Sequence, residues 1–495
     1  MSYDIYGNLN EVDYNTAGLT YSIVTIHDVL GRLREVDNTD TNGTFKLGYS
    51  YDLAGNLTQI QDLTTNAIYA SGFQYNEMNQ LHWLTFGNGV KTRLNYDTTL
   101  GSYRLQDLLT YSGGSTVSDS TPASSACSTL GSNALQCLSY QYDLTSNVTA
   151  MTDSTTGGVN RSFQYDNDNQ LLDATGPWGS QIFTYDQVGN ITSKSSTARA
   201  KATGIGWVDT LATHAKFQLP GNRDTQTYTY DSNRTQLLTG VGSTTYQFDL
   251  YGALKARGTT DGFIFDAENE LAEYDGATLT ERYFYDENHT RLEKSNSNGA
   301  TVTDSKWYER TSNAGVYTHR NIFAGNRKIG FFSDSTGQVQ YVHPDHLGSN
   351  VTITDHNGNL ILSQQFAPYG ELVSQSGSFT ETKEGYSDKY LDPETGLNYF
   401  GERYFLPGIG RWASSDPKYN TGAGSTAPMD ARGISNRVNL WKFSFDNPIR
   451  FRDDDGRAPG DVWLYAPDGS SISRAISAAE SIYTDLTGAG NGGGL

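Results

Sequence analysis

A seven-residue unit that reads Tyr-Asp-x-x-Gly-Asn-Leu recurs along more than half of this 495-residue chain. Neighbouring copies start 17 to 24 residues apart where both are recognisable. The clearest copies are Tyr3–Leu9, Tyr51–Leu57 and Tyr185–Ile191, and looser ones begin at Tyr75, Tyr96, Tyr142, Tyr165, Tyr230, Phe248, Phe265 and Tyr285. A period of this length indicates one supersecondary unit that is repeated and stacked.

Each copy has the properties of a β-hairpin. An alternating strand such as Ser71–Tyr75 enters the turn, and another such as Leu57–Ile60 leaves it. The Asp side chain can accept hydrogen bonds from backbone N–H groups of the turn, and Gly or Asn at the fifth or sixth position suits the positive φ of a type I turn with a G1 bulge. Because one hairpin cannot bury its aromatic face alone, we predict an all-β fold in which hairpins join into a continuous sheet.

The composition agrees with many short strands and excludes several function classes. Tyr (33), Phe (20) and Gly (52) are abundant, although only 36% of the residues are hydrophobic. The formal net charge of −20 repels phosphate backbones, so we expect no nucleic-acid partner. No apolar run is long enough to span a membrane. No signal peptide precedes Tyr3, so the N-terminus is expected to be a fragment boundary or a late start inside a repeat.

The stretch Tyr390–Pro417 differs from the repeats before it. Turn-forming pairs such as Asp392-Pro393 alternate there with aromatic residues that favour strands. It also contains Arg403 and Asp416, two charges in aromatic and glycine-rich surroundings. Such a segment either plugs the fold or forms a site.

These motifs together resemble the RHS family, which comprises rearrangement-hotspot proteins, the C components of Tc toxins and the teneurins. The seven-residue unit resembles its YD repeat, Tyr390–Pro417 its repeat-associated core, Tyr341–Ser349 its D-H-L-G-S element and Gln365–Gly370 the element that follows, and Asn447-Pro448 completes the ordered series. The resemblance implies YD repeats over residues 1–330, the RHS core over 331–456 and a variable tail over 457–495. It also implies a sheet that spirals into a hollow shell, which the core closes at one end. Because shells of this family generally use more chain, we expect the terminal portion of a shell or an orphan fragment.

In toxin members of the family, the core is an aspartyl autoprotease that cuts once, after a final Asp-Pro-x-Gly, and frees an effector inside the shell. By motif, Asp416 matches one carboxylate, Asp453 matches the leading Asp of the final motif, and Arg403 matches an arginine that pairs or steers a carboxylate. Two close carboxylates suit peptide hydrolysis because their pKa values split, so that one activates water and the other donates a proton to the amide. The resemblance therefore implies a single-turnover enzyme at most.

The chain departs from this motif at two positions. Asp454 replaces the expected proline, and Tyr419 replaces the glycine of an earlier copy, Asp416–Tyr419. Loss of the proline frees the backbone and adds carboxylates, which makes Asp455 an alternative catalytic residue. The competing interpretation is that Asp416 and Asp453 only cap turns, as Asp commonly does beside Pro and Gly.

The remaining motifs have simpler interpretations. His343, Asp345 and His346 suit zinc, but no further ligand cluster lies nearby, so we interpret them as strand and turn residues at the start of the core. Asp166–Gln170 begins like a calcium loop but lacks its Gly and its closing Glu, so we interpret it as a repeat turn. The chain has no Walker loop, H-E-x-x-H, G-x-S-x-G or dinucleotide motif. We therefore expect no cofactor and no metal.

Two further segments have open interpretations. Cys127 and Cys137 share a Ser/Thr/Gly-rich segment and could pair across it, but two cysteines do not make a disulfide framework. Residues 470–486 could form one amphipathic helix. The tail that contains them is too short for an ordinary enzymatic domain, so the effector is truncated or a remnant.

The leading hypothesis is a secreted or delivered bacterial polymorphic-toxin component. Its partners would be its own truncated effector, delivery machinery and an immunity protein. The alternatives are a YD-repeat adhesion protein that binds cell-surface glycans, and an inert fragment. A shell predicts a concave wall around a cavity, with Arg403, Asp416 and Asp453 converging at its inner face. An adhesion module predicts an open sheet with an exposed aromatic patch.

Overall fold

The computed structural model describes residues 2–3, 9–16, 19–98, 102–114, 116–196, 225–286, 289–297, 301–312, 317–377, 379, 384–417, 439–457 and 459–461. Tyr419 and the helix predicted over 470–486 lie outside these residues. Within them, 32 strands form one sheet, which confirms the prediction of an all-β fold. None of the helices in these ranges is long and apolar enough to cross a membrane.

The strands of the sheet are short and follow one another with tight turns. The first half comprises β1 (Ser2–Tyr3), β2 (Leu9–Thr16), β3 (Leu19–His27), β4 (Leu33–Asp40), β5 (Gly43–Tyr51), β6 (Leu57–Asp62), β7 (Ile68–Tyr75), β8 (Leu81–Phe86), β9 (Lys91–Asp97), β10 (Arg104–Tyr111), β11 (Ala134–Tyr142), β12 (Val148–Asp153), β13 (Arg161–Tyr165), β14 (Leu171–Gly176), β15 (Gly179–Tyr185) and β16 (Ile191–Ser196). The second half comprises β17 (Gln226–Tyr230), β18 (Leu238–Val241), β19 (Thr244–Phe248), β20 (Leu254–Arg257), β21 (Asp261–Phe265), β22 (Leu271–Asp275), β23 (Thr280–Tyr285), β24 (Arg291–Asn296), β25 (Thr301–Asp304), β26 (Tyr308–Ser312), β27 (Tyr317–Ala324), β28 (Arg327–Ser333), β29 (Gln338–His343), β30 (Thr352–Thr354), β31 (Leu360–Phe366) and β32 (Leu372–Gly377).

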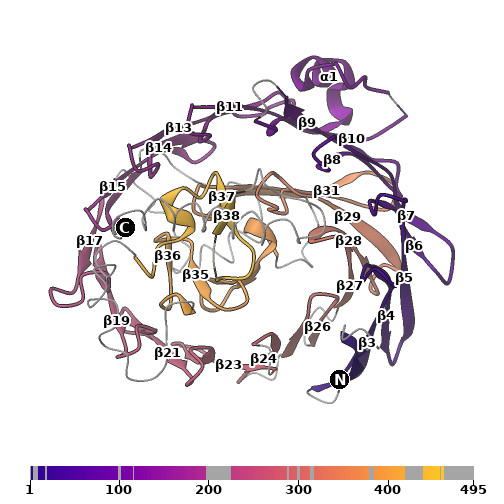
Figure 1. The fold of residues 1–495 in the computed structure, drawn as a ribbon. Helices are drawn as coiled ribbons and strands as arrows, with labels where there is room; N and C mark the ends of the chain where they lie inside the picture. The colour runs from indigo at the N-terminus through magenta and orange to yellow at the C-terminus, as the bar shows by residue number, and fades with distance from the viewer. Residues whose placement is uncertain are drawn as a thin grey trace, which may run out of the picture.

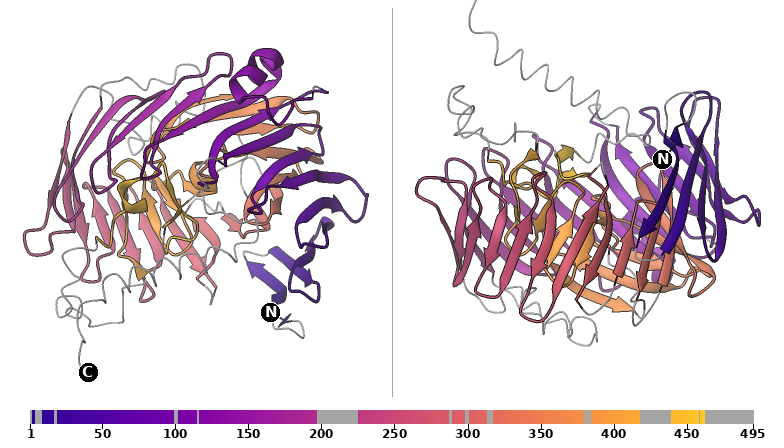
Figure 2. Two further views of the ribbon diagram at one scale, coloured as in Figure 1. Left: turned by 45° about the horizontal axis from the view of Figure 1, so that its top comes forward. Right: turned by 90° about the horizontal axis from the view of Figure 1, so that it is seen from below.

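The sheet is an antiparallel meander in which each strand pairs with the next one along the chain, as β4 pairs with β5 from Glu35↔Gly48 to Asp40↔Gly43. Successive turns therefore fall alternately on two rims of the sheet. The sheet curls into a round wall that passes itself, so that β26–β31 lie inside β3–β10 (Figures 1 and 2). This geometry confirms the spiral that the family resemblance implied.

The repeat unit forms the turn that the sequence predicted. Oδ1 of Asp52 accepts hydrogen bonds from the backbone N–H groups of Ala54 (2.9 Å) and Asn56 (2.8 Å). Gly55, at the fifth position, has φ +91°, and the strand register shifts at Tyr51, as a bulge requires. Equivalent Asp-capped turns begin at Asp143, Asp166, Asp186, Asp249, Asp266, Asp345 and Asp355.

The tyrosine of the unit joins one hairpin to the previous one. Its hydroxyl donates a hydrogen bond to a backbone carbonyl of the preceding repeat, as Tyr51 does to Leu33 (2.7 Å) and Tyr185 to Leu171 (2.7 Å). Further members of this series are Tyr75, Tyr96, Tyr142, Tyr165, Tyr230 and Tyr285. These bonds cross-link neighbouring hairpins in addition to the strand pairing.

The two overlapping layers of the spiral share a hydrophobic core. The rings of Tyr21 and Tyr308 stack with centroids 4.4 Å apart, and Phe45 packs against Phe332. Buried side chains from β3–β8 and β26–β29 complete this core. The overlap therefore fixes the spiral at its seam by side-chain packing.

The chain after β32 turns into the space that the wall encloses (Figure 1). It forms a small sheet of β33 (Tyr390–Asp392), β34 (Leu397–Tyr399), β35 (Tyr404–Leu406) and β36 (Arg411–Trp412), and a pair of β37 (Phe451–Asp453) and β38 (Pro459–Asp461). Its buried aromatic residues pack in one cluster with the inward-facing residues of β9–β23. The predicted cavity is therefore filled, over this part of the wall, by the chain's own core segment.

The core segment also contacts the rim that carries the YD turns. Nδ2 of Asn447 donates to Oδ1 of Asn147 (2.8 Å), and Nδ2 of Asn439 donates to Oδ1 of Asn190 (2.8 Å). Nε1 of Trp441 donates to the carbonyl oxygen of Gly252 (3.0 Å). The core thus closes the wall at this rim, as the resemblance implied.

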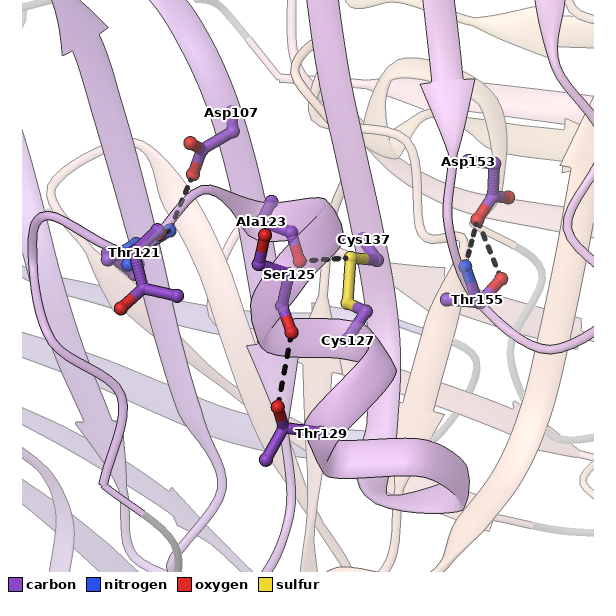
Figure 3. Close-up of a disulfide and its surroundings, with 10 residues drawn as sticks. Asp107, Thr121, Ala123, Ser125, Cys127, Thr129, Cys137, Asp153 and Thr155 are labelled. Atoms are coloured by element: carbon purple, nitrogen blue, oxygen red, sulfur yellow. Dashed lines mark hydrogen bonds and ion pairs between the residues drawn. A yellow bond between two sulfur atoms is a disulfide. The ribbon is translucent and has the colours of Figure 1, made fainter.

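One helix, α1 (Ala123–Leu130), lies on the outside of the wall between β10 and β11 (Figure 1). Cys127 of the helix forms a disulfide with Cys137 of β11 (Figure 3). On the neighbouring strands, the fully buried Arg93 of β9 pairs with Asp107 of β10 at 3.0 Å. The pairing that the sequence left open therefore fastens the helix to the wall.

Candidate functional site

The structure brings Arg403, Asp416 and Asp453 together from three elements. Arg403 precedes β35, Asp416 follows β36, and Asp453 ends β37. Nη1 of Arg403 lies 3.4 Å from Oδ2 of Asp416, and Nη2 lies 3.4 Å from Oδ2 of Asp453. One guanidinium therefore joins the two carboxylates that the sequence motifs selected.

The guanidinium of Arg403 is enclosed by protein. It lies over the ring of the buried Trp412, 4.1 Å from the ring centroid. Burial lowers the pKa of Arg403, while Asp416 and Asp453 oppose that change. Nε of Arg403 donates a hydrogen bond to the carbonyl oxygen of Gly456. The side chain thus contacts two acids and one peptide carbonyl at once.

Asp453 is a buried carboxyl group with a raised pKa. Burial raises its pKa to about 6, although Arg403 opposes the rise. Its Oδ1 accepts a hydrogen bond from the backbone N–H of Gly456 at 2.7 Å. A carboxyl group with this pKa exchanges protons near neutral pH, which suits general acid or base catalysis.

The two carboxylates next to Asp453 have different partners. Oδ1 of Asp455 accepts a hydrogen bond from the backbone N–H of Arg457 at 2.9 Å, so it lies beside the peptide nitrogen that follows Gly456. Oδ1 of Asp454 instead lies 2.7 Å from Nε of Arg452. Asp455 therefore belongs to the site, whereas the residue that replaces the family's proline points to another arginine.

Close backbone packing holds the segment around Gly456 in place. The N–H of Glu402 donates to the carbonyl oxygen of Asp455 at 2.9 Å. A Cβ at Gly401 would lie 2.9 Å from that same oxygen, and a Cβ at Gly456 would lie 2.9 Å from the backbone nitrogen of Arg403. Both glycines also have positive φ. This approach of two backbones requires glycine on each side.

The arrangement has the groups that hydrolysis of a peptide bond requires: a hydrogen-bond donor to the carbonyl oxygen and nearby carboxyl groups. The carbonyl of Gly456 is polarised by a charged donor, and the acids Asp416, Asp453 and Asp455 surround it or its donor. A guanidinium that contacts a carbonyl oxygen can stabilise the negative charge that develops there during hydrolysis. The peptide bond between Gly456 and Arg457 is therefore the candidate scissile bond.

The residues that suit zinc have structural partners. Nε2 of His343 lies 2.8 Å from Oγ1 of Thr354, and burial lowers the pKa of this histidine to about 3. Nε2 of His346 lies 2.9 Å from the carbonyl oxygen of Ile449, and Asp345 caps its own turn. In the described ranges, no group of three or more His, Cys, Asp or Glu is placed to hold a metal ion.

Sequence reasoning missed three features of the site. Trp412, which supports Arg403, was visible only as one of the aromatic residues of Tyr390–Pro417. Lys389 donates to the carbonyl oxygen of Asp454, and burial, followed by the nearby Arg452, lowers its pKa. The family motif implied cleavage after Gly456, but nothing in the sequence indicated that the carbonyl oxygen of Gly456 contacts Arg403.

A curled sheet of YD hairpins that encloses its own core segment defines an RHS-type shell protein. A model of the teneurin YD-shell matches residues 123–449, and a model of the RHS repeat matches residues 27–67. Since the first match covers more than half of the sequence, the chain belongs to the teneurin YD-shell family.

Relatives in other organisms include toxin subunits and teneurins. The chain is 30% identical over 207 residues to toxin subunit YenC1 of Yersinia entomophaga, a match of 37% of this chain and 20% of the relative. It is 27% identical over 254 residues to Teneurin-3 of Danio rerio, a match of 45% of this chain and 9% of the relative. The chain is thus related to toxin subunits, and its matches span a fifth or less of these relatives.

Solved structures share the fold. A crystal structure of TcdB2-TccC3-Cdc42 matches with a TM-score of 0.71 at 20% identity, over 92% of this chain and 23% of that one. A Tc holotoxin pore from Photorhabdus luminescens matches with a TM-score of 0.68 at 21% identity, over 89% of this chain and 21% of that one. The spiral wall with its enclosed core is therefore an architecture already known from Tc toxins.

Proposed function

We propose that this chain is the shell portion of a polymorphic toxin and that its core hydrolyses its own peptide bond after Gly456. The observation that supports this proposal is the guanidinium of Arg403, which contacts the Gly456 carbonyl, Asp416 and Asp453 at the same time. The alternative that both acids only cap turns does not account for their shared arginine. The match to toxin subunits supports a toxin-related role for the shell.

The proposed chemistry gives each of these groups one role. Asp416 takes a proton from a water molecule, whose oxygen bonds to the carbonyl carbon of Gly456. Arg403 stabilises the resulting oxyanion. As the C–N bond breaks, Asp453 in its protonated form supplies the proton that the leaving nitrogen of Arg457 needs, and Asp455 is the alternative donor beside that nitrogen. The products are a carboxylate at Gly456 and an amine at Arg457.

Cleavage would leave the two products associated. β38, beyond the candidate bond, pairs with β37 before it, from Phe451↔Asp461 to Asp453↔Pro459. Arg457 also forms an ion pair with Glu402. The segment after Gly456 is therefore proposed to remain docked in the shell until another event releases it.

The wider role is proposed from the relatives. We assign the shell to a secreted or delivered bacterial protein, with the downstream effector, delivery machinery and an immunity protein as partners. The disulfide agrees with passage through an oxidising compartment. An adhesive module would need an open aromatic surface, whereas this sheet curls on itself and buries many of its tyrosine and phenylalanine rings.

Intact mass spectrometry of the expressed chain tests the proposal. Under denaturing conditions we expect a main species that ends at Gly456, and under native conditions we expect the two products to travel together. Asp416→Asn and Asp453→Asn should each yield the full-length mass. Asp454→Asn is the matched control, since its carboxylate faces Arg452, and it should be cut like the parent. A full-length parent, or cutting of both Asn variants at the parental rate, would overturn the proposal.

A further inference from the structure

A large cavity lies where the two layers of the spiral overlap. It has a volume of about 900 Å³ and is bounded by turns of β3–β8 on one side and by residues 306–307 and 323–326 on the other. Its volume falls in the range of small-molecule sites. The hydrophobic core between the layers therefore does not close at this end of the seam.

The wall of the cavity is aromatic. Tyr49, Tyr51, Phe73, Trp307 and Phe323 all line it. The rings of Trp307 and Phe323 meet edge to face, with centroids 5.3 Å apart. Contact between such aromatic surfaces and water is unfavourable, so they favour an apolar or aromatic ligand.

A single ammonium group lies among these rings. Nζ of Lys306 is 5.1 Å from the ring centroids of both Trp307 and Phe323. Within the part of the chain that the structure describes, no carboxylate forms an ion pair with it. Lys306 is exposed to solvent, and the charge of Asp388 acts on it from beyond ion-pair distance.

The other cation at the cavity is already neutralised. Nη2 of Arg32 pairs with Asp28 at 2.6 Å, and its guanidinium covers the ring of Tyr51. Leu30 and Leu53, on neighbouring turns that line the cavity, are 73% and 109% exposed. The cavity therefore combines exposed leucines, aromatic rings and the ammonium of Lys306.

We propose that this cavity binds an amphipathic organic anion, with its apolar body against the aromatic rings and its acidic group at Lys306. The strongly acidic chain would otherwise repel anions, so the charge of Lys306 gives the site its selectivity. Because the ligand would contact both layers of the spiral, its binding would also stabilise the seam.

A matched pair of fluorescent probes tests this site. Anilinonaphthalene sulfonate carries an anion on an aromatic body, and N-phenylnaphthylamine has the same body without the charge. We expect one saturable site for the sulfonate, a higher melting temperature in its presence, and at least tenfold weaker binding of the uncharged probe.

Variants locate the site. Lys306→Met keeps the apolar stem and should weaken sulfonate binding at least tenfold without changing binding of the uncharged probe. Lys255→Met, at an exposed position on β20, should leave both unchanged. Trp307→Leu should weaken both probes. Equal affinity of the parent for both probes, or no effect of Lys306→Met, would overturn the proposal.

Competition distinguishes the sources of such an anion. Displacement of the sulfonate by naphthoate supports an aryl acid as the ligand class, and displacement by decanoate supports an alkyl acid. If neither displaces it, the cavity does not recognise organic acids and the proposal fails.

Discussion

Arg403 is the residue on which the candidate site depends, because its guanidinium lies between the acids and the carbonyl of the candidate bond. Its five N–H donors in one plane allow it to serve Asp416, Asp453 and Gly456 together. A lysine at this position would present one ammonium and could not span them. The stacked ring of Trp412 fixes the plane of the guanidinium.

The pKa of Asp453 predicts how self-cleavage depends on pH. With a pKa of about 6, this carboxyl group is mostly protonated at pH 5 and mostly ionised at pH 7.5. If it is the general acid, only the protonated form is active, so the rate should fall roughly 50- to 100-fold between pH 6.5 and pH 8.5. Chain recovered unfolded from inclusion bodies can be refolded by dilution at each pH and followed by mass spectrometry. A rate that rises over this interval would assign Asp453 the role of base.

Buried charges hold the core segment against the wall. The side chain of Arg291 on β24 is fully buried and pairs with Asp392 at 2.8 Å, and Lys294 pairs with the same carboxylate at 2.9 Å. Because Asp392 belongs to the turn-forming pair Asp392-Pro393, this turn anchors the core segment to the wall.

Removal of the ion pair between Arg291 and Asp392 should destabilise the fold. Arg291→Met leaves Asp392 buried with only part of its compensation, so we expect a loss of about 3 kcal/mol in the free energy of unfolding, measured in urea. Arg282→Met on β23 is the control, since its side chain is 66% exposed and pairs with Glu273. It should cost less than about 1 kcal/mol. Equal costs would show that the buried pair does not stabilise the core segment.

At the scale of elements, the positive φ in the YD turn predicts that replacing its glycine lowers the free energy of unfolding. Gly55 has φ +91°, and the nearest atom to an added Cβ would be 3.6 Å away, on Arg32. Gly55→Ala should therefore cost about 1–2 kcal/mol through its φ alone. Gly114→Ala has nothing within 4 Å and lacks a positive φ, so it should stay within about 0.5 kcal/mol of the parent. Similar losses in urea melts of both variants would contradict this account of the turn.

The disulfide predicts a local effect on α1. The bond joins Cys127 and Cys137, which are ten positions apart, so its loss should destabilise this region by about 2–3 kcal/mol. The double variant Cys127→Ala, Cys137→Ala should show faster amide exchange in α1 and β11. The parent treated with a reductant should behave in the same way, and exchange that does not respond to the reductant would mean that packing alone holds the helix.

The turns could be predicted from sequence because their hydrogen bonds are local. Asp52 reaches N–H groups two and four residues ahead, so the residue types alone indicate the geometry. The tyrosine hydroxyl bonds could not be predicted in this way, because Tyr51 reaches Leu33 in the previous hairpin. Their regular spacing becomes meaningful only when neighbouring hairpins are known to pair.

The candidate site was predicted in part, and only through the family resemblance. The motifs selected Arg403, Asp416 and Asp453, which the fold brings together, while their catalytic roles stay a prediction. The contact of Arg403 with the Gly456 carbonyl joins residues 53 positions apart. No local pattern encodes such a contact, because it depends on how β35 and β37 pack.

At the scale of the whole molecule, the wall and the core segment stabilise each other. Every wall strand pairs with its neighbours in sequence, so the sheet could open at any point if nothing covered its concave face. The core segment covers much of this face, and the overlap of β26–β29 with β3–β8 closes the seam. The sequence of the repeats gave no indication of where that overlap would occur.

The hydrogen bonds at the seam predict that a substitution there destabilises mainly the adjacent strands. Asp40 on β4 is buried and accepts hydrogen bonds from the Tyr308 hydroxyl (2.9 Å) and from Nη2 of Arg320 (3.0 Å), on the overlapping layer. Asp40→Ala leaves both donors buried, which should cost about 3 kcal/mol, or roughly 100-fold in the local opening equilibrium. Amide exchange should accelerate by that factor in β3–β5, β26 and β27.

Strands far from the seam provide the comparison. Exchange in β13–β16 should change by less than about threefold, because the buried side chains of these strands belong to the cluster around the core segment and not to the seam cluster. Asp37→Ala on the same β4 strand is the control, since Asp37 pairs with the partly exposed Lys46, and it should cost less than about 1 kcal/mol. If Asp40→Ala instead accelerates exchange equally in every strand, the wall unfolds as one cooperative unit and the seam is not a separate element of stability.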